Sequence, residues 1–482
     1  MSGLAALGVG EGDSVALLLR NDIAFLEASL ATGRLGAYAV PINWHAKRNE
    51  IEAILKDSGA KILIAHADLA AVFSAAIPTV AVSTPRDIID AYGLDTKDCR
   101  IPAHVPEWES WLGRHDPWAR ALRRPRGSIV YTSGTTGLPK GIQREACANE
   151  AEEQEFTRTL HDNFGIKPGV RSLICGPLYH SMQTANMKAA FGALGEDGVM
   201  VIEPRFDPQR LLADIAEHRV TQILMVPVMF VRLLRLEQTI RRRYPLGSLE
   251  CVVHSAAPCP FEIKRSMIDW FGPVINEFYA ASEIGAVALI GSADALRKPG
   301  SVGRALPGCT VKVLDAGGKE LPAGARGEIA AVNHAYPGFT YRNRPEARAA
   351  LDRGGLVATG DIGYLDDEGF LFLCGRNSDM VISGGVNIFP AEIEQTLASC
   401  PGVADCAVFG IPDEEYGEVL AAHIEPQAGF DLTEAEVRAY LRERLPGFKL
   451  PRIVRFDDSL PREDSGKIFK RRLRDPYWAR TR

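Results

Sequence analysis

The stretch that organises the rest of the chain is Tyr131-Thr132-Ser133-Gly134-Thr135-Thr136-Gly137-Leu138-Pro139-Lys140-Gly141. It follows the apolar run Ser128-Ile129-Val130, which predicts a short buried strand. Its eleven positions hold three glycines, four Ser/Thr hydroxyls and one lysine. Glycines allow backbone N–H groups to approach an anion closely, hydroxyls add hydrogen-bond donors, and lysine adds a positive charge. The stretch therefore predicts a loop that wraps phosphates.

This loop departs from the Walker pattern G-x-x-x-x-G-K-[ST] in two places. Pro139 precedes Lys140 where the Walker pattern has glycine, and Gly141 stands where Ser or Thr would bind magnesium. A proline at this position also disfavours a helix that begins at the lysine. Gly/Thr loops are also common as ordinary surface turns, so the remainder of the chain has to decide between the two interpretations.

Size and composition indicate a globular protein with several cores. The 482 residues suggest about three domain-sized units, and 46% hydrophobic with 24% charged residues is ordinary for such a protein. A net charge of -6 gives no support for nucleic-acid binding. Nine cysteines without a C-x-x-C pair favour reduced thiols. We therefore expect a cytoplasmic protein, with no secretory signal and no transmembrane segment.

Alternating patterns predict parallel βαβ units over the first 275 or so residues. Asn21 is expected to cap the first long helix, and residues 94–126 are expected to connect over the surface. Because ligands bind beyond the carboxyl ends of strands in open α/β sheets, we expect the loops after Val130, Val253 and Ile275 to converge. The predicted strands are 15–19, 61–65, 172–175, 199–202, 222–226 and 250–253.

The pattern of predicted helices and strands changes twice in the second half of the chain. From about residue 300, short β-like runs with Gly/Pro turns predict a small barrel or sandwich, and the last hundred or so residues read as a compact α+β unit. The expected fold class is therefore α/β, with a large N-terminal domain of parallel βαβ sheets, a β-barrel-like subdomain at about 300–376 and a small α+β C-terminal domain.

Further stretches resemble, in order, the motifs of the adenylate-forming superfamily, and in particular its acyl-CoA synthetases. The phosphate loop at 131–141 is the first of them. Each is ambiguous alone, because a surface glutamate, an aspartate in a turn or a solvated basic helix face would look the same. The collinear set is specific, and it covers nearly the whole chain. The other stretches are Pro177-Leu178-Tyr179-His180-Ser181, Ser255-Ala256-Ala257-Pro258, Asn276 to Glu283, Thr359-Gly360-Asp361, Gly375-Arg376-Asn377-Ser378-Asp379, Ser383 to Glu394, and Leu460 to Ile468.

The resemblance implies a site for ATP and Mg²⁺. Tyr279 would stack on adenine, Asp361 would accept hydrogen bonds from the ribose, and Glu283 together with Thr132 would hold Mg²⁺. Ala256 occupies a position where many members have glycine. The nucleotide- and CoA-binding residues implied are Thr132, Ser133, Gly134, Thr135, Thr136, Gly137, Lys140, Ala256, Ala257, Pro258, Glu277, Phe278, Tyr279, Ser282, Asp361, Arg376, Gly384 and Gly385.

The resemblance also implies a catalytic set and a moving domain. Lys467, His180 and Glu283 would be catalytic, with Lys467 on a mobile C-terminal domain at 379–482. The N-terminal domain would span 1–376, with a hinge near 377–378. Ser378 stands where the family usually has Asp or Lys, which leaves the ease of rotation open. Members usually carry a few dozen more residues at the start, so we expect a strand and a helix to be missing there.

The implied reaction is the activation of a carboxylic acid by ATP and its transfer to coenzyme A, because the chain shows no carrier-protein module. Alternatives are a standalone adenylation enzyme that loads a carrier protein, a light-producing oxygenase, and a nucleotide-binding regulator without turnover. The assembly that the resemblance suggests is a homodimer. An apolar strip predicts an aliphatic, aromatic or alicyclic monocarboxylate as substrate; it consists of His180, Met182, Val226, Val228, Met229, Ala256 and Ala281.

Overall fold

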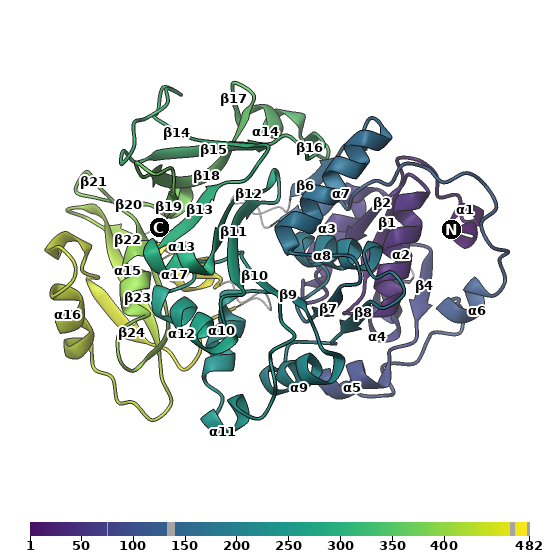
Figure 1. The fold of residues 1–482 in the computed structure, drawn as a ribbon, viewed down its shortest axis with the longest axis horizontal. Coiled ribbons are helices and arrows are strands. Elements are labelled where there is room, and N and C mark those ends of the chain that lie inside the picture. Colours follow the sequence, from purple (N-terminus) through teal and green to yellow (C-terminus); the bar gives the residue numbers. More distant parts are fainter. Residues whose placement is uncertain (75, 133–139, 463–467, 480–482) are drawn as a thin grey trace.

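The computed structural model describes residues 1–74, 76–132, 140–462 and 468–479. Within them the strands form four sheets of four, twelve, three and five strands. The first sheet and the C-terminal five-stranded sheet lie toward opposite ends of the long axis, with the large sheet between them (Figure 1). This arrangement agrees with the predicted α/β fold and its smaller α+β C-terminal part.

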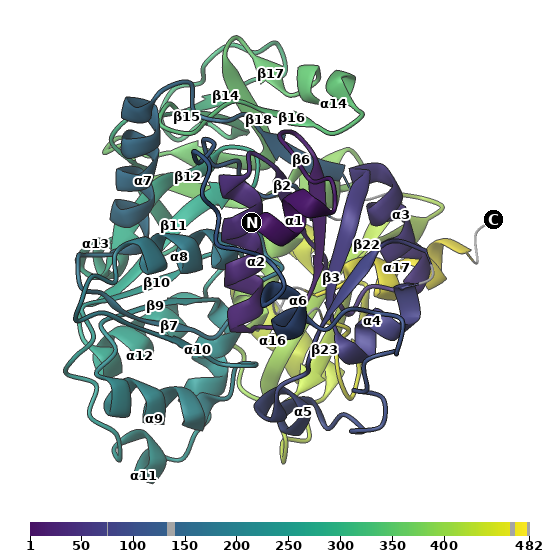
Figure 2. The ribbon, with the colours of Figure 1, turned by 90° about the vertical axis from the view of Figure 1, so that its right-hand side faces the viewer.

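The first sheet is parallel, in the order β2-β1-β3-β4, as the strand–helix–strand spacing predicts. The strands are almost wholly buried, because helices cover both of their faces (Figure 2). The elements are α1 (Ser2–Ala6), β1 (Ser14–Leu18), α2 (Ile23–Arg34), β2 (Tyr38–Pro41), α3 (Arg48–Ser58), β3 (Ala60–His66), α4 (Ala67–Phe73), β4 (Thr79–Val82), α5 (Arg86–Tyr92) and α6 (Trp108–Leu112).

Two details of this region differ from the sequence-based expectation. The N-cap of α2 is Asp22, not Asn21. The Asn21 amide is buried instead, where its Nδ2 donates to the carbonyls of Gly176 and Glu203 and its Oδ1 accepts from the N–H of Leu178. The segment 94–126 is not wholly a surface connection, since it contains α6, whose two tryptophans are buried in the core of the first sheet.

The large sheet combines parallel and antiparallel strands, in the order β14-β15-β18-β19-β13-β12-β11-β10-β9-β7-β8. Its parallel part consists of β7 (Arg171–Ile174), β8 (Val199–Ile202), β9 (Gln222–Met225), β10 (Cys251–His254) and β11 (Ile275–Ala281). Apolar side chains of these strands alternate between two cores, one under α9, α10 and α12 and the other under α7 and α8. The helices are α7 (Glu150–Phe164), α8 (Ser181–Gly192), α9 (Pro208–His218), α10 (Pro227–Leu234), α11 (Gln238–Arg241), α12 (Phe261–Phe271) and α13 (Ser292–Arg297).

The β-rich region from about residue 300 is present, and its strands are hydrogen-bonded into this same sheet. The connection runs through β12 (Gly285–Gly291), which pairs antiparallel with both β11 and β13. The remaining elements are β13 (Ser301–Ala305), β14 (Cys309–Leu314), β15 (Gly327–Asn333), α14 (Pro345–Ala349), β17 (Asp352–Arg353), β18 (Leu356–Leu365) and β19 (Leu371–Arg376).

The strand before the phosphate loop has a different role from the one expected. Residues of β5 (Val130–Thr132) pair antiparallel with β6 (Lys140–Arg144), and β16 (Phe339–Tyr341) adds to the other side of β6. The loop after Val130 is therefore unlike the loop after Val253, which follows the parallel strand β10. It connects the two strands of a hairpin. Strand β11 is also longer than predicted, because it continues through the aromatic motif to Ala281.

The C-terminal sheet has its own hydrophobic core, formed with α15 (Pro390–Leu397) and α16 (Glu434–Arg442). It follows the short 3₁₀ turn Asn377–Asp379, so the position predicted for the hinge lies between two sheets. The hinge itself and the mobility of 379–482 stay predictions. The other elements are β20 (Val381–Ser383), β21 (Val386–Ile388), β22 (Val403–Asp413), β23 (Gly417–Pro426), a 3₁₀ turn (Gly447–Lys449), β24 (Ile453–Phe456) and α17 (Lys470–Ala479).

Candidate active site

The two ends of the phosphate loop are described, whereas Ser133, Gly134, Thr135, Thr136 and Gly137 lie outside the described residues. Thr132 and Lys140 are register partners at the loop end of the β5–β6 hairpin. The Lys140 ammonium lies 5.3 Å from the centre of the Tyr341 ring, within cation–π distance. The hairpin therefore presents a hydroxyl and a positive charge side by side at the base of the loop.

Tyr279, Asp361 and Arg376 meet although they are far apart in the sequence. The Tyr279 hydroxyl donates to Asp361 Oδ2 at 2.6 Å, and Arg376 Nε lies 3.3 Å from Asp361 Oδ1. β18 and β19 bring Asp361 and Arg376 into register. Burial, followed by the Asp361 charge, raises the pKa of Tyr279 well above its usual value, so the phenol stays a donor. Because each carboxylate oxygen has two acceptor positions, Asp361 keeps acceptor capacity for sugar hydroxyls.

Ser282 and Glu283 lie just beyond the end of β11, next to the hairpin. Glu283 Oε1 accepts a hydrogen bond from the Tyr341 hydroxyl at 2.7 Å, and the carbonyl of Ser282 accepts one from Arg144 at 2.7 Å. Burial lowers the pKa of the Arg144 guanidinium, while the nearby Tyr336 and Glu283 oppose that shift. The strands β6 and β16 thus fix the predicted metal-binding carboxylate from the side of the phosphate loop.

His180 precedes α8 as its N-terminal flanking residue. Its neighbour Ser181 has its hydroxyl 3.5 Å from that of Ser282, which places the segment 177–181 beside the end of β11. The backbone of the same segment is held from the first sheet by Asn21. The structure therefore brings His180, Ser282 and Glu283 into one region.

The loop 255–260 joins β10 to α12 and carries the predicted Ala256, Ala257 and Pro258. Ala256 has φ of +76°, a left-handed conformation that L-residues with a Cβ rarely adopt. Only three non-glycine residues among those described have a positive φ. A backbone held in this region at a loop between two site elements is the kind of local strain that accompanies function.

Glu277 and Phe278 do not have the side-chain role expected of nucleotide-binding residues. The Glu277 carboxylate is 5% exposed and forms an ion pair with the equally buried Lys264 of α12. Phe278 is 3% exposed and packs in the core under α7 and α8, 5.9 Å from the Phe164 ring. Only the backbone of these two residues remains for contact with a nucleotide.

The predicted residues of the C-terminal part divide into two sets. Gly384 and Gly385 form the turn between β20 and β21, with φ of +55° and +80°, and the N–H of Gly384 donates to the carbonyl of Tyr416. Glycine is required there because both residues are left-handed. Lys467 lies outside the described residues, so its catalytic role stays a prediction from the sequence.

Four contributing residues were not predicted from the sequence, namely Arg144, Lys264, Tyr341 and His254. Their partners lie on other elements, so no local motif identifies them. A signal was present for one of them, since His254 directly precedes the motif that begins at Ser255. The other three could be assigned only once the strands and helices were placed.

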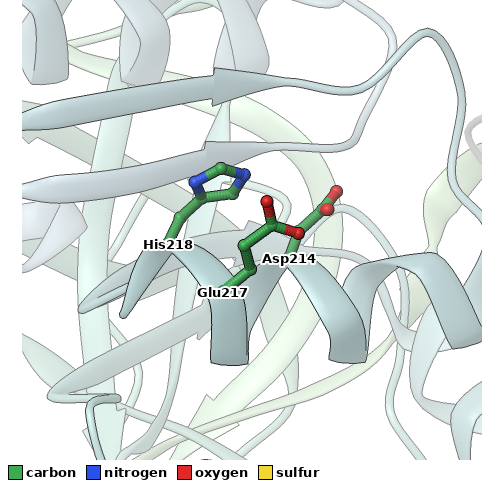
Figure 3. Close-up of side chains that lie close together, drawn as sticks. All are labelled: Asp214, Glu217 and His218. Carbon is green, nitrogen blue, oxygen red and sulfur yellow. The ribbon is translucent and has the colours of Figure 1, made fainter.

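A separate group of side chains could ligate a metal ion, at the end of α9 (Figure 3). One ligand atom from each of Asp214, Glu217 and His218 lies within 4.8 Å of the others. The His218 carbonyl accepts a hydrogen bond from Arg171, the first residue of β7. The group thus lies at the amino ends of the parallel strands, the edge opposite to that of the site loops. Asp214 already forms an ion pair with Arg210, and Glu217 is exposed, so the group needs no ion to explain it.

Two family models match the chain. That of the AMP-binding enzymes matches residues 2–334, which is more than half of the sequence, and that of the AMP-binding enzyme C-terminal domain matches residues 392–467. The chain belongs to the AMP-binding enzyme family. The predicted membership of the adenylate-forming superfamily is thereby confirmed, and so is nucleotide binding in general. The predicted acyl-CoA synthetase type is confirmed by the relatives described next.

Relatives align over almost the whole chain. It is 31% identical to a feruloyl-CoA synthase of an Amycolatopsis species, with 98% of this chain and 90% of that protein covered. It is 33% identical to the long-chain-fatty-acid–CoA ligase FadD13 of Mycobacterium tuberculosis, with 99% and 90% covered. Among solved structures, o-succinylbenzoate-CoA synthetase of Bacillus subtilis in complex with the acyl-adenylate intermediate matches with a TM-score of 0.81, at 28% identity over 98% of this chain and 90% of that one.

Among the described residues, every helix is too short or too polar to cross a membrane. All nine cysteines are free thiols. Burial raises the pKa of several of them, for example that of Cys259 to about 12, so these thiols are protonated and poor nucleophiles at neutral pH.

Proposed function

We propose that this chain activates a carboxylic acid with MgATP as an acyl-adenylate and then transfers the acyl group to coenzyme A, with release of AMP and pyrophosphate. It is an AMP-forming acid–thiol ligase. The observation that carries the proposal is the meeting of Tyr279, Asp361 and Arg376 beside Ser282 and Glu283. The segment 279–283 there supplies an aromatic ring and a carboxylate that suits a hard cation, and the distant Asp361 supplies an acceptor for sugar hydroxyls.

The residues present fit the parts of MgATP. Asp361 can accept from ribose hydroxyls while it keeps its bonds to Tyr279 and Arg376. Glu283 offers hard oxygen ligands, and the hydroxyl of Thr132 adds another on the hairpin. Mg²⁺ held there would neutralise charge on the phosphate oxygens. Lys140 and the loop that follows Thr132 would hold the outer phosphates through backbone N–H groups and charge.

Lys467 is proposed to supply the positive charge at the reacting centre, between the acid carboxylate and the α-phosphate. Positioning and electrostatic stabilisation supply most of what such a transfer requires. In the second half-reaction, rotation of the C-terminal domain about Ser378 would withdraw Lys467 and present the turn at Gly384 and Gly385 to the adenylate. The thiol of coenzyme A would then displace AMP.

The Lys467→Ala variant tests this assignment. It should lose adenylate formation, measured by ATP–pyrophosphate exchange, while it keeps thioester formation from preformed acyl-adenylate. An equal loss of both half-reactions would contradict the role. Glu283→Ala should lose activity chiefly through its use of magnesium and nucleotide, and an unchanged Mg²⁺ dependence would exclude the metal role.

The acid is proposed to be an aliphatic, aromatic or alicyclic monocarboxylate. Two residues of the apolar strip, Val226 and Met229, are buried at the start of α10 beside the end of β9. The names of the relatives include one aromatic acid and one long-chain fatty acid, so both classes belong in a screen. A panel of carboxylic acids with ATP and CoA, followed by pyrophosphate release, identifies the substrate.

The same panel separates the alternatives. Pyrophosphate release that does not depend on CoA would favour a standalone adenylation enzyme that loads a carrier protein. Light emission would favour an oxygenase, and the absence of exchange with every acid would favour a nucleotide-binding regulator. A homodimer and a cytoplasmic location are proposed on the same resemblance, to be tested by light scattering and by fractionation.

A further inference from the structure

A buried ionic cluster lies directly behind the loop 255–260. Lys264 of α12 and Glu277 of β11 form an ion pair in which both residues are 5% exposed. His254, the last residue of β10, is fully buried and is the register partner of Glu277. The edge of the Phe230 ring from α10 lies against it, with 5.1 Å between the ring centres. Four elements around the loop thus meet at this cluster.

The charges of the cluster balance only while the pair is intact. Burial, together with the neighbouring Lys264 charge, holds the pKa of His254 well below its usual range, so the imidazole is neutral. Burial also raises the pKa of Glu277, and Lys264 opposes that rise. Since an isolated ion is strongly disfavoured in a protein interior, Lys264 and Glu277 each require the other as a partner. Through them, α12 is tied to β11.

This tie bears on the backbone of the loop. The left-handed conformation of Ala256 is strained for a residue with a Cβ, so it persists only where the surroundings fix the chain on both sides. On one side, His254 is fixed by pairing of β10 with β9 and β11. On the other side, Lys264 fixes α12, which begins at Phe261.

The Lys264–Glu277 ion pair is also close in sequence to the predicted adenine-binding ring of Tyr279. Glu277 lies two residues before Tyr279 on β11, so their side chains share one face of the strand. The side chain of Phe278, between them, points to the opposite face. A change in the pair therefore shifts the loop relative to the strand that carries Tyr279. None of the three cluster residues has to contact a substrate for this effect.

We propose that the Lys264–Glu277 ion pair is a positioning device for nucleotide and acid, which sets the distance between the loop 255–258 and the Tyr279 ring. The inference rests on the proposed function, because it assigns the pair to that site. It predicts that the identity of the pair matters for substrate affinity even where the fold tolerates its loss. A pair that served only the fold would not behave in this way.

The experiment separates affinity from stability with four variants of the full chain. Lys264→Met and Glu277→Gln each break the pair, and Lys264→Met/Glu277→Leu replaces it with apolar groups of similar size. As a control outside the cluster, Lys298→Met removes ion pairs to Asp366 and Glu368. Each variant is measured for its urea midpoint, for AMP affinity by calorimetry, and for kcat and KM of ATP in ATP–pyrophosphate exchange.

The single variants should be destabilised, because one buried charge is left uncompensated, and the double variant should regain most of the stability. We expect the KM of ATP and the dissociation constant of AMP in the double variant to stay at least fivefold above those of the parent. Its kcat should be within about threefold of the parent value. Lys298→Met should leave both constants unchanged. If the double variant regains parent-like affinity together with stability, the pair is structural only and the proposal is overturned.

Two further readouts keep the test decisive. Should the double variant not fold, Lys264→Arg takes its place: the cation is retained but its short contact is altered, and parent-like AMP affinity in it would overturn the proposal. AMP calorimetry requires no turnover. A parent enzyme that binds AMP but adenylates no acid would therefore refute the proposed function, whereas unchanged AMP affinity in the variants would refute only the positioning role.

Discussion

Replacing Tyr279 by phenylalanine removes one hydroxyl and keeps the ring. That hydroxyl is the donor to Asp361 Oδ2 at 2.6 Å, in a residue that is 7% exposed. A hydrogen bond to a charged group contributes roughly 1.5–3 kcal/mol. In the variant, the Asp361 carboxylate keeps the 3.3 Å contact to Arg376, whose side chain is 55% exposed and therefore orients it weakly.

The lower end of that range corresponds to about tenfold in affinity. We expect Tyr279→Phe to raise the KM of ATP by up to about that factor, because a loosely held Asp361 meets the ribose hydroxyls less well. The value of kcat should change little, since the hydroxyl is remote from the proposed reacting centre. The effect should be the same from pH 6 to pH 9, because burial and Asp361 keep the pKa of Tyr279 well above that window.

Tyr341→Phe is the matched control, because it removes a comparable hydroxyl that donates to Glu283 Oε1 at 2.7 Å. It should shift the Mg²⁺ concentration for half-maximal exchange and leave the KM of ATP at saturating Mg²⁺ nearly unchanged. Both variants are assayed by ATP–pyrophosphate exchange at saturating acid. If Tyr279→Phe alters the Mg²⁺ dependence, or if both variants change the same constant, the assignment of two separate contacts is refuted.

Three further predictions concern stability, each measured by urea unfolding. Ala256→Gly should gain about 0.5 kcal/mol, since relief of the left-handed backbone exceeds the entropy cost of glycine; a loss would contradict the strain. Asn21→Ala should cost about 3 kcal/mol, because three buried backbone groups lose their partner, and a change under 1 kcal/mol would disprove that bridge. Glu203 is buried beside Asp214, and burial followed by Asp214 raises its pKa to about 9 from an ordinary 4.5. The protonated Glu203 therefore contributes its full share of the free energy of unfolding below pH 4.5, and this contribution is lost as the pH rises through 9. The stability of Glu203→Gln relative to the parent should therefore increase by up to about 1.4 kcal/mol per pH unit in that window, and parallel pH curves would exclude the raised pKa.

The sequence predicted the alternation of strands and helices in the parallel regions well. Strands such as β1, β3 and β8 have the expected positions, because their apolar runs and the helices between them are local patterns. Pairing was predicted less well. The phosphate loop was expected after a parallel strand, yet Val130 pairs with Ile142 in a hairpin. Residue composition gives no register for two short strands that flank a glycine-rich loop.

The candidate site was predicted in its residue types but not in its internal contacts. Tyr279, Glu283 and Asp361 were assigned from motifs, whereas the bond between Tyr279 and Asp361 joins residues 82 positions apart. Glu277 was expected to serve the nucleotide, and its carboxylate is instead held by Lys264. The reason is that strand alternation turns Glu277 to the side of α12, and the partner there depends on how that helix packs.

The sequence by itself determined the family and the chemical groups available to it, from the phosphate loop at 131–141 to the predicted lysine at 467. Motif residues are read locally, since each keeps its type and spacing whatever surrounds it. Only the tertiary structure decided which of these groups contact one another and what holds them, as with Tyr341 on Glu283 and Lys264 on Glu277. Such contacts follow from sheet register and helix packing, which depend on residues throughout the chain rather than on any single stretch.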